Sequence, residues 1–324
     1  MQTTELKGYA IGYDEANGDA AFTAKVLQEE LNKRTGLDFA LVPSGEGSIE
    51  LSIGQTKAPA PEGFAYDAAD GMVAIEGYDR SGLIHGAGHL LREANWYKGG
   101  LSVPDASCRT HPRKKLRGSQ VGYRNKTNAY VAWTKETYHQ YIRDLALFGA
   151  SAIEFLPPAT DDEAGSPVMK YDALDMLQYT SAVAHEYGLE VWIWYPNMER
   201  NRTSHPIPKN GFLPETDDEA KCLNEDLRRE DAMRDHDFSK VPYVDHILIP
   251  GGDPGGLEPE DLFAFSERVA DILHKYHPKA GVWISAQVMK NSDDFKFRFY
   301  DEVAKRPAWL TGVCHAPWVS HTMK

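Results

Sequence analysis

Three carboxylates lie in or near the ends of apolar runs in the second part of the chain, where they could act together on a substrate. Asp253 follows HILIPGG, Glu154 lies within SAIEFLPP, and Glu199 follows EVWIWYPNM. Carboxyl groups serve as general acid, general base or nucleophile in the hydrolysis of glycosidic bonds. We therefore take Asp253, Glu154 and Glu199 as the candidate catalytic residues.

Aromatic and hydrogen-bonding side chains occur near the ends of the same runs. Amide, guanidinium and imidazole groups bind hydroxyl groups, while aromatic rings stack on the apolar faces of sugar rings. This combination predicts a carbohydrate substrate. The candidate substrate-binding residues are Gln120, Tyr123, Arg124, Trp194, Tyr195, Asn197, Gln287, His315 and Trp318.

Several of these residues also have a structural interpretation. Gly251 and Gly252 allow a tight turn that brings Asp253 close to a ligand. Asp253 could instead cap a short turn, with Pro254 in its first position. Glu154 has the alternative of a buried, paired carboxylate, and Trp194 shares one side of its run with Trp192, which makes a core position the alternative for either ring.

The elements that would position these residues alternate between strand and helix from residue 112 to residue 324. Such alternation is typical of parallel βαβ units. No nucleotide-type GxGxxG follows the first strand, so we predict a TIM-type (β/α) barrel rather than a doubly wound sheet, with its site at the carboxyl ends of the strands. The expected strands lie in LRGSQVGYR, SAIEFLPP, EVWIWYPNM, HILIPGGD, AGVWISAQ and WLTGVCHAP.

The number of units departs from a closed barrel. Eight units close such a barrel, whereas six are found here, and two more would need about 60 residues. Either the chain is a piece of a longer protein, or the barrel is open and another element covers its edge. We favour the first interpretation and expect the catalytic domain at 112–324 to be incomplete.

Residues 1–111 are predicted to form a separate small α/β domain. Strands are expected in KGYAIGYD and SIELSIG, and a hairpin in AYDAADGMVAIEGYD turns at Asp70 and Gly71. Helices are expected from DAAFTAKVLQEELNKRTGL and from DRSGLIHGAGHLLREANW. The polar segment RTHPRKKLRG would link the two domains or make the first contact between them.

Composition excludes several classes of partner. The chain has 324 residues and a formal net charge of −13, which opposes binding to nucleic acid or to an anionic membrane. Neither a spanning apolar run nor a cleavable leader is found. We therefore expect a cytoplasmic protein, or a periplasmic or secreted one whose signal has been removed. The pattern indicates no cofactor, and it carries no signal of oligomeric state.

A rival site lies in HGAGHLLRE, where His85, His89 and Glu93 follow one another at intervals of four residues. Two imidazoles and a carboxylate on one helical face could bind zinc and support a metal-dependent hydrolase. The metalloprotease motif, however, needs Glu directly after its first His, and Gly86 stands there. The two glycines of this segment instead suit close packing. Cys108, Cys222 and Cys314 form no CxxC pair.

The segment GYDRSGLIHGAGHLLRE resembles the D-x-R-G-x-x-Y-G-x-x-x-L-L segment of a known family group. That segment belongs to the small α/β domain that precedes the catalytic barrel in β-hexosaminidases and α-glucuronidases. The resemblance implies a non-catalytic first domain that packs on a glycosidase barrel. The matching residues are Asp79, Arg80, Gly82, Gly86, Leu90 and Leu91, with His85 in place of the usual Tyr.

The same resemblance extends to the end of the fourth barrel strand. Hexosaminidases carry G-G-D-E there, where the Asp orients the 2-acetamido group and the Glu is the general acid. Gly251, Gly252 and Asp253 match, but Pro254 replaces the acid and has no proton to give. The resemblance therefore implies a glycoside hydrolase whose acid comes from elsewhere, with Glu154 and Glu199 as candidates. The alternative is a non-catalytic carbohydrate-binding protein on a glycosidase scaffold.

Overall fold

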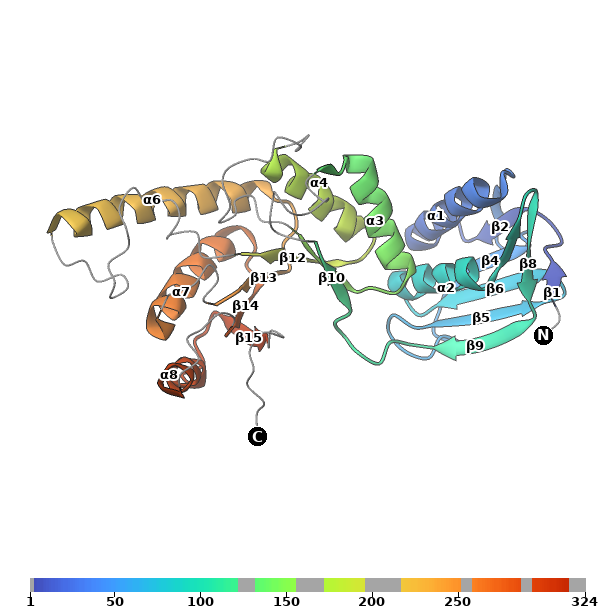
Figure 1. Cartoon of the computed structure of the whole chain (residues 1–324). Helices are drawn as coiled ribbons and strands as arrows, with labels where there is room; N and C mark the ends of the chain where they lie inside the picture. Colours follow the sequence, from blue (N-terminus) through green and yellow to red (C-terminus); the bar gives the residue numbers. More distant parts are fainter. Residues whose placement is uncertain are drawn as a thin grey trace. The chain divides into compact units, whose positions relative to one another are not determined.

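The computed structural model describes residues 3–121, 132–155, 172–195, 217–251, 258–286 and 293–314. Within the helix at 217–240 it describes the side chains of 228 and 230–240. The chain divides into two compact units (Figure 1). Unit 1 comprises Met1–Gly118, Gln140–Ser151 and Tyr187–Leu189; unit 2 comprises Ser119–His139, Ala152–Glu186 and Glu190–Lys324.

Unit 1 contains two sheets and two helices, as expected for a small α/β domain. The six-stranded sheet has the order β3-β2-β4-β6-β5-β9, and the three-stranded sheet has the order β1-β8-β7. The helices α1 and α2 contact each other and strands of both sheets (Figure 1). The elements are β1 (Thr3–Glu5), β2 (Ala10–Tyr13), α1 (Gly18–Thr35), β3 (Ala40–Pro43), β4 (Ile49–Ile53), β5 (Phe64–Ala69), β6 (Met72–Gly77), α2 (Arg80–Glu93), β7 (Asn95–Tyr97), β8 (Gly100–Pro104) and β9 (Ala106–Thr110).

Local signals in the sequence account for the central elements of this unit. The side chain of Asn17 accepts hydrogen bonds from the backbone at the start of α1, and Gly36 ends that helix with φ of 73°. The turn between β5 and β6 has positive φ at Asp70 (52°) and at Gly71 (72°), which fits a two-residue antiparallel hairpin. The predicted hairpin and both predicted helices are thus confirmed.

The polar segment after β9 is held within unit 1. Arg117 donates from Nε to the backbone oxygen of Gly149 at 2.8 Å, and its guanidinium also pairs with Glu62. The contacts of unit 1 therefore continue to Gly118, beyond residue 111.

Unit 2 is built from six strands that follow one another both in the chain and in the sheet. The sheet order is β10-β11-β12-β13-β14-β15, and each pair from β11 to β15 is parallel. A doubly wound sheet would reverse its strand order part-way, so this order is that of a TIM-type barrel. The strands are β10 (Gly118–Gln120), β11 (Ala152–Phe155), β12 (Glu190–Trp194), β13 (His246–Ile249), β14 (Gly281–Ser285) and β15 (Leu310–Cys314).

A helix separates each strand of unit 2 from the next (Figure 1). No helix in the described part of the chain is both long and apolar enough to cross a membrane. The helices are α3 (Lys135–Leu147), α4 (Ala173–Glu186), α6 (Asp217–Lys240), α7 (Pro259–Tyr276) and α8 (Asp293–Ala304).

The two faces of the unit 2 sheet differ in chemistry. One face is aliphatic and fully buried, through Ile153, Val191, Ile247 and Ile284, as expected beneath a layer of helices. We call the opposite face the interior face, because it corresponds to the inside of a barrel. The register of the paired strands determines which polar side chains lie on the interior face.

Candidate functional site

Glu154 lies on the interior face, at the carboxyl end of β11. Its side chain makes a hydrogen bond with Gln120, the last residue of β10. The Oε1 atom of Glu154 is buried and has no hydrogen-bond partner among the residues that the structure describes. Burial raises the pKa of the Glu154 carboxyl to about 7, while the Gln120 hydrogen bond acts in the opposite direction. Such a group is half-protonated near neutral pH, as a general acid requires.

The register of the parallel strands extends the row that contains Glu154. Glu154 pairs with Trp192 on β12, Trp192 with His246 on β13, and His246 with Gly281 on β14. Paired residues in a parallel sheet point to the same face. The row therefore places a carboxyl, an indole and an imidazole side by side on the interior face.

Trp192 and Trp283 form an aromatic floor around His246 in this row. The Trp192 ring lies 4.3 Å from the His246 ring and 5.4 Å from the Trp283 ring, measured between centroids. A Cβ atom at Gly312 would lie 2.4 Å from Trp283, so the glycine leaves room for the indole. Barrel interiors are usually filled by Val, Ile and Leu, and this row departs from that rule.

Trp194 and Tyr195, both predicted to bind substrate, fall on opposite faces of the sheet. Trp194 shares the interior face with Trp192 and is buried. Tyr195 points toward α6, where its ring lies 5.4 Å from that of Phe238 and its hydroxyl bonds with Arg234. Tyr195 thus occupies a core position between strand and helix, not one that lines the interior face.

Cys314 on β15 lies within electrostatic reach of Glu154. Burial raises the pKa of the Cys314 thiol to about 11, and the charge of Glu154 contributes to the rise. Their strands are four steps apart in the sheet, which would be about 19 Å in a flat sheet. An interaction across that number of strands indicates that the sheet curls, as the wall of a barrel does.

The other predicted site residues lie outside the described residues, so their roles stay predictions. They are Asp253, Glu199, Tyr123, Arg124, Asn197, Gln287, His315 and Trp318.

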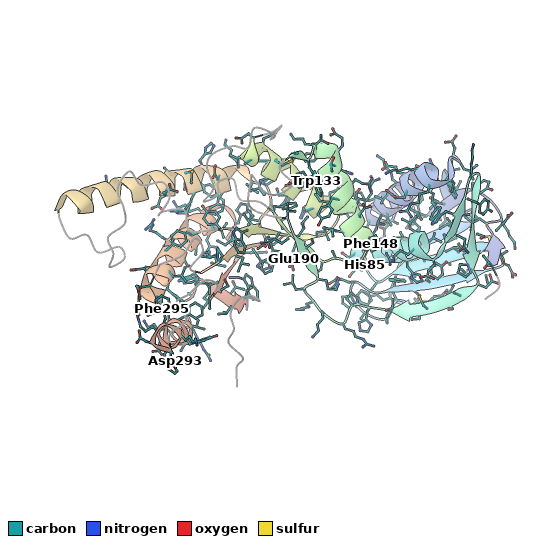
Figure 2. All side chains as sticks on the ribbon, in the orientation of Figure 1. His85, Trp133, Phe148, Glu190, Asp293 and Phe295 are labelled. Carbon is teal, nitrogen blue, oxygen red and sulfur yellow. The ribbon has the colours of Figure 1, made fainter. Side chains whose placement is uncertain are left out.

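The rival metal site is not assembled among the described residues. His85, on α2 (Figure 2), shares a hydrogen bond of 3.0 Å between its Nδ1 and the backbone oxygen of Glu62. His89 instead faces the thiol of Cys108, at 3.7 Å between Nε2 and Sγ. In the described ranges, no group of three or more His, Cys, Asp or Glu side chains is placed to hold a metal ion.

Comparison with solved structures identifies the architecture. A mutant Streptomyces plicatus β-hexosaminidase in complex with its product GlcNAc matches with a TM-score of 0.71 and 17% identity, over 97% of this chain and 71% of that chain. The chain has the fold of the bacterial β-hexosaminidases. The GH20 β-N-acetylhexosaminidase of Streptomyces coelicolor matches with a TM-score of 0.70 and 16% identity, over 97% of this chain and 72% of that chain.

A third bacterial enzyme supports the same fold. The β-N-acetylhexosaminidase of Bacteroides fragilis matches with a TM-score of 0.62 and 14% identity, over 99% of this chain and 76% of that one. No family model and no curated protein sequence matches the chain. The hexosaminidase side of the resemblance is therefore supported at the level of fold, and the α-glucuronidase side stays a prediction.

Sequence reasoning did not select Glu190, His246 and Trp283. Glu190 and His246 open β12 and β13, and Glu190 is marked in Figure 2. For Glu190 and His246, a polar residue at the first position of an otherwise apolar strand was the available signal. The prediction considered only the carboxyl ends of the strands, where a barrel site is expected, and therefore did not include these residues.

Proposed function

We propose that the protein is a glycoside hydrolase acting on an oligo- or polysaccharide, with Glu154 as its general acid. The observation that supports this role is the buried Glu154 carboxyl, whose pKa is raised to about 7 on the interior face of the barrel-type sheet. Protonated Glu154 would give its proton to the glycosidic oxygen as the bond breaks. The transition state would then resemble an oxocarbenium ion.

The partner carboxylate in this proposal is Asp253, with Glu199 as the second candidate. Retaining enzymes hold the two carboxyl groups about 5 Å apart, and inverting enzymes hold them about 6.5–9.5 Å apart. Pro254 stands where hexosaminidases carry their acid, so Glu154 would supply the missing proton. In this scheme 112–324 is the catalytic domain and 1–111 is the non-catalytic domain.

A turnover screen tests the proposal. The wild type, Glu154→Gln and Asp253→Asn would be incubated with aryl glycosides, including N-acetylglucosaminides and glucuronides, and with plant and host glycans. On the natural glycans we expect Glu154→Gln to lower kcat by at least roughly a hundredfold, because glutamine cannot donate the proton. The acid must be protonated, so wild-type activity should fall as the pH rises through about 7.

An aryl glycoside with an activated leaving group provides the control. Such a substrate needs no protonation of its leaving oxygen, so Glu154→Gln should retain much more activity on it than on a natural glycan. Equal loss on both substrates would contradict the role as general acid.

The second candidate is a non-catalytic carbohydrate-binding protein. Pro254 favours it, because the residue at the acid's place cannot transfer a proton. Glycan binding that persists in Asp253→Asn, without turnover by any form of the protein, is the result expected in that case.

A further inference from the structure

On the interior face, two hydrogen bonds and one longer polar contact form a line that crosses three neighbouring strands. Trp192 donates from Nε1 to Glu190 Oε2 at 3.2 Å, and Trp283 donates from Nε1 to His246 Nδ1 at 3.2 Å. The His246 Nε2 atom faces the same Glu190 oxygen at 3.8 Å. The line thus joins both tryptophans of the aromatic floor through one imidazole and one carboxylate.

The hydrogen bond from Trp283 fixes the protonation state of His246. An indole N–H only donates, so the His246 Nδ1 atom must carry a lone pair. The proton of the neutral ring therefore sits on Nε2, where it points at the Glu190 carboxylate. A proton added to Nδ1 would place two donors against each other and break the bond to Trp283.

The ring of His246 has little freedom to avoid this conflict. It packs against Trp192 on one side, and a Cβ atom at Gly281 would lie 2.3 Å from its Nδ1. The glycine allows the imidazole to lie across β14 and reach the indole of Trp283. His246 is also paired in register with Trp192, which is paired with Glu154.

We propose that His246 is a positioning residue of the site: as the Nε2–H tautomer it fixes Trp283 and, together with Glu190, Trp192 in the row that includes Glu154. This inference rests on the proposed function, because it assigns a role beside the proposed general acid. Neutral His246 keeps the aromatic floor in place, and protonated His246 releases Trp283.

The charges around His246 determine where this change occurs. Burial lowers the pKa of His246 below its ordinary value of 6.5, while Glu190 on β12 and the adjacent Asp245 act in the opposite direction. The side chain of Asp245 accepts from the backbone of Val191. The neighbour on β14, Trp283, is uncharged, and the transition lies on the acid side of 6.5.

Nuclear magnetic resonance of the full chain with ¹⁵N-labelled histidine and tryptophan tests the tautomer directly. At pH 7.5 we expect the His246 Nδ1 atom to be unprotonated and its Nε2 atom protonated. The indole N–H signal of Trp283 should shift on acidification with the same midpoint as the imidazole. The signals are assigned by their loss in His246→Asn and in Trp283→Phe. The proposal is overturned if Nδ1 is protonated at pH 7.5. It is also overturned if the Trp283 indole N–H signal does not shift while the His246 imidazole titrates.

Two variants of His246 test its effect on turnover and on the pH profile of turnover. His246→Asn offers an amide oxygen to Trp283 without titrating, whereas His246→Phe removes the acceptor. Asn should keep turnover within about threefold at neutral pH and move the acid limb of the pH profile to lower pH. Phe should lower kcat/KM by roughly tenfold or more at every pH, because the indole N–H loses its partner.

The two failures can be distinguished. If the wild type turns over no substrate, the proposed function has failed, and the titration of the Trp283 signal still decides whether His246 holds that indole. If turnover occurs and the acid limb of His246→Asn equals that of the wild type, the positioning role is overturned while the function stands.

Discussion

At the scale of single residues, the environment of Glu154 gives the site its chemistry. Apolar and aromatic neighbours in β11 and β12 bury the carboxyl, so its ionised form is disfavoured. The sequence identified Glu154 as a candidate because it stands near the end of an apolar run. It did not indicate the size of the pKa shift, which depends on neighbours from other strands.

The raised pKa of Glu154 predicts a pH-dependent effect on stability. The folded protein holds this proton up to about pH 7, whereas the unfolded chain releases it near 4.5. Wild-type stability should therefore fall as the pH rises through this window. Glu154→Gln should match the wild type near pH 4 and exceed it at pH 8 by an amount of the order of 3 kcal/mol.

Urea unfolding at pH 4, 6 and 8 would measure this difference. Glu46→Gln, at an exposed position, is the matched control and should show no such growth with pH. A constant difference between Glu154→Gln and the wild type across the range would refute the buried, protonated carboxyl.

Residue-level prediction was weakest where the direction of a side chain decides its role. The alternation in EVWIWYP already places Trp192 and Trp194 on one side of the strand and Tyr195 on the other. Choosing Tyr195 for substrate contact overlooked that alternation. The structure places Tyr195 against Phe238 and Arg234.

At the scale of elements, the sequence predicted the strongly patterned segments and missed several short strands of the first domain. Helices α1 and α2 were found because their caps and apolar spacing are local signals. Strands β1, β3, β7, β8 and β9 have three to five residues each, and pairing with distant partners, not their own pattern, makes them strands.

Close packing of α2 explains its glycines and yields a second prediction. A Cβ atom at Gly88 would lie 1.8 Å from the backbone oxygen of Leu147, which also accepts a 2.6 Å hydrogen bond from Arg92. Gly88→Ala should therefore destabilise the protein by about 1–3 kcal/mol, although alanine favours helices.

A matched substitution separates packing from helix propensity. Gly18 opens α1, and a Cβ atom placed there would meet no neighbour within 4 Å. Gly18→Ala should therefore change the free energy of unfolding by less than about 0.5 kcal/mol. Equal effects of the two substitutions in urea unfolding would show that α2 does not pack as described.

At the scale of the whole molecule, the charge of −13 discriminates between substrate classes. A negative protein repels anionic glycans at long range, and salt screens this repulsion over about 10 Å at 0.1 M. For a substrate that carries uronates, kcat/KM should rise as sodium chloride increases from 10 to about 300 mM. For a neutral N-acetylglucosaminide, kcat/KM should stay constant, and a fall with salt for the anionic substrate would contradict the argument.

The division into two units was predictable because regular alternation of strands and helices begins near residue 112. The extent of each unit was not. Residues 140–151 join unit 1 through contacts such as the pair of Arg143 and Glu29, at 2.5 Å between Nη2 and Oε2, and residues 187–189 bind Arg143 in turn through the Tyr187 hydroxyl. Contacts of this kind join residues far apart in the chain and leave no local pattern.

The sequential order of strands β10 to β15 also has a consequence for folding during translation. Each strand after β10 lies beside the one synthesised just before it, so its partner strand already exists when the new unit emerges. A doubly wound sheet must wait for distant partners, with its edges exposed meanwhile. Here growth proceeds in one direction, and a pause in translation after any helix would leave a single growing edge instead of scattered unpaired strands.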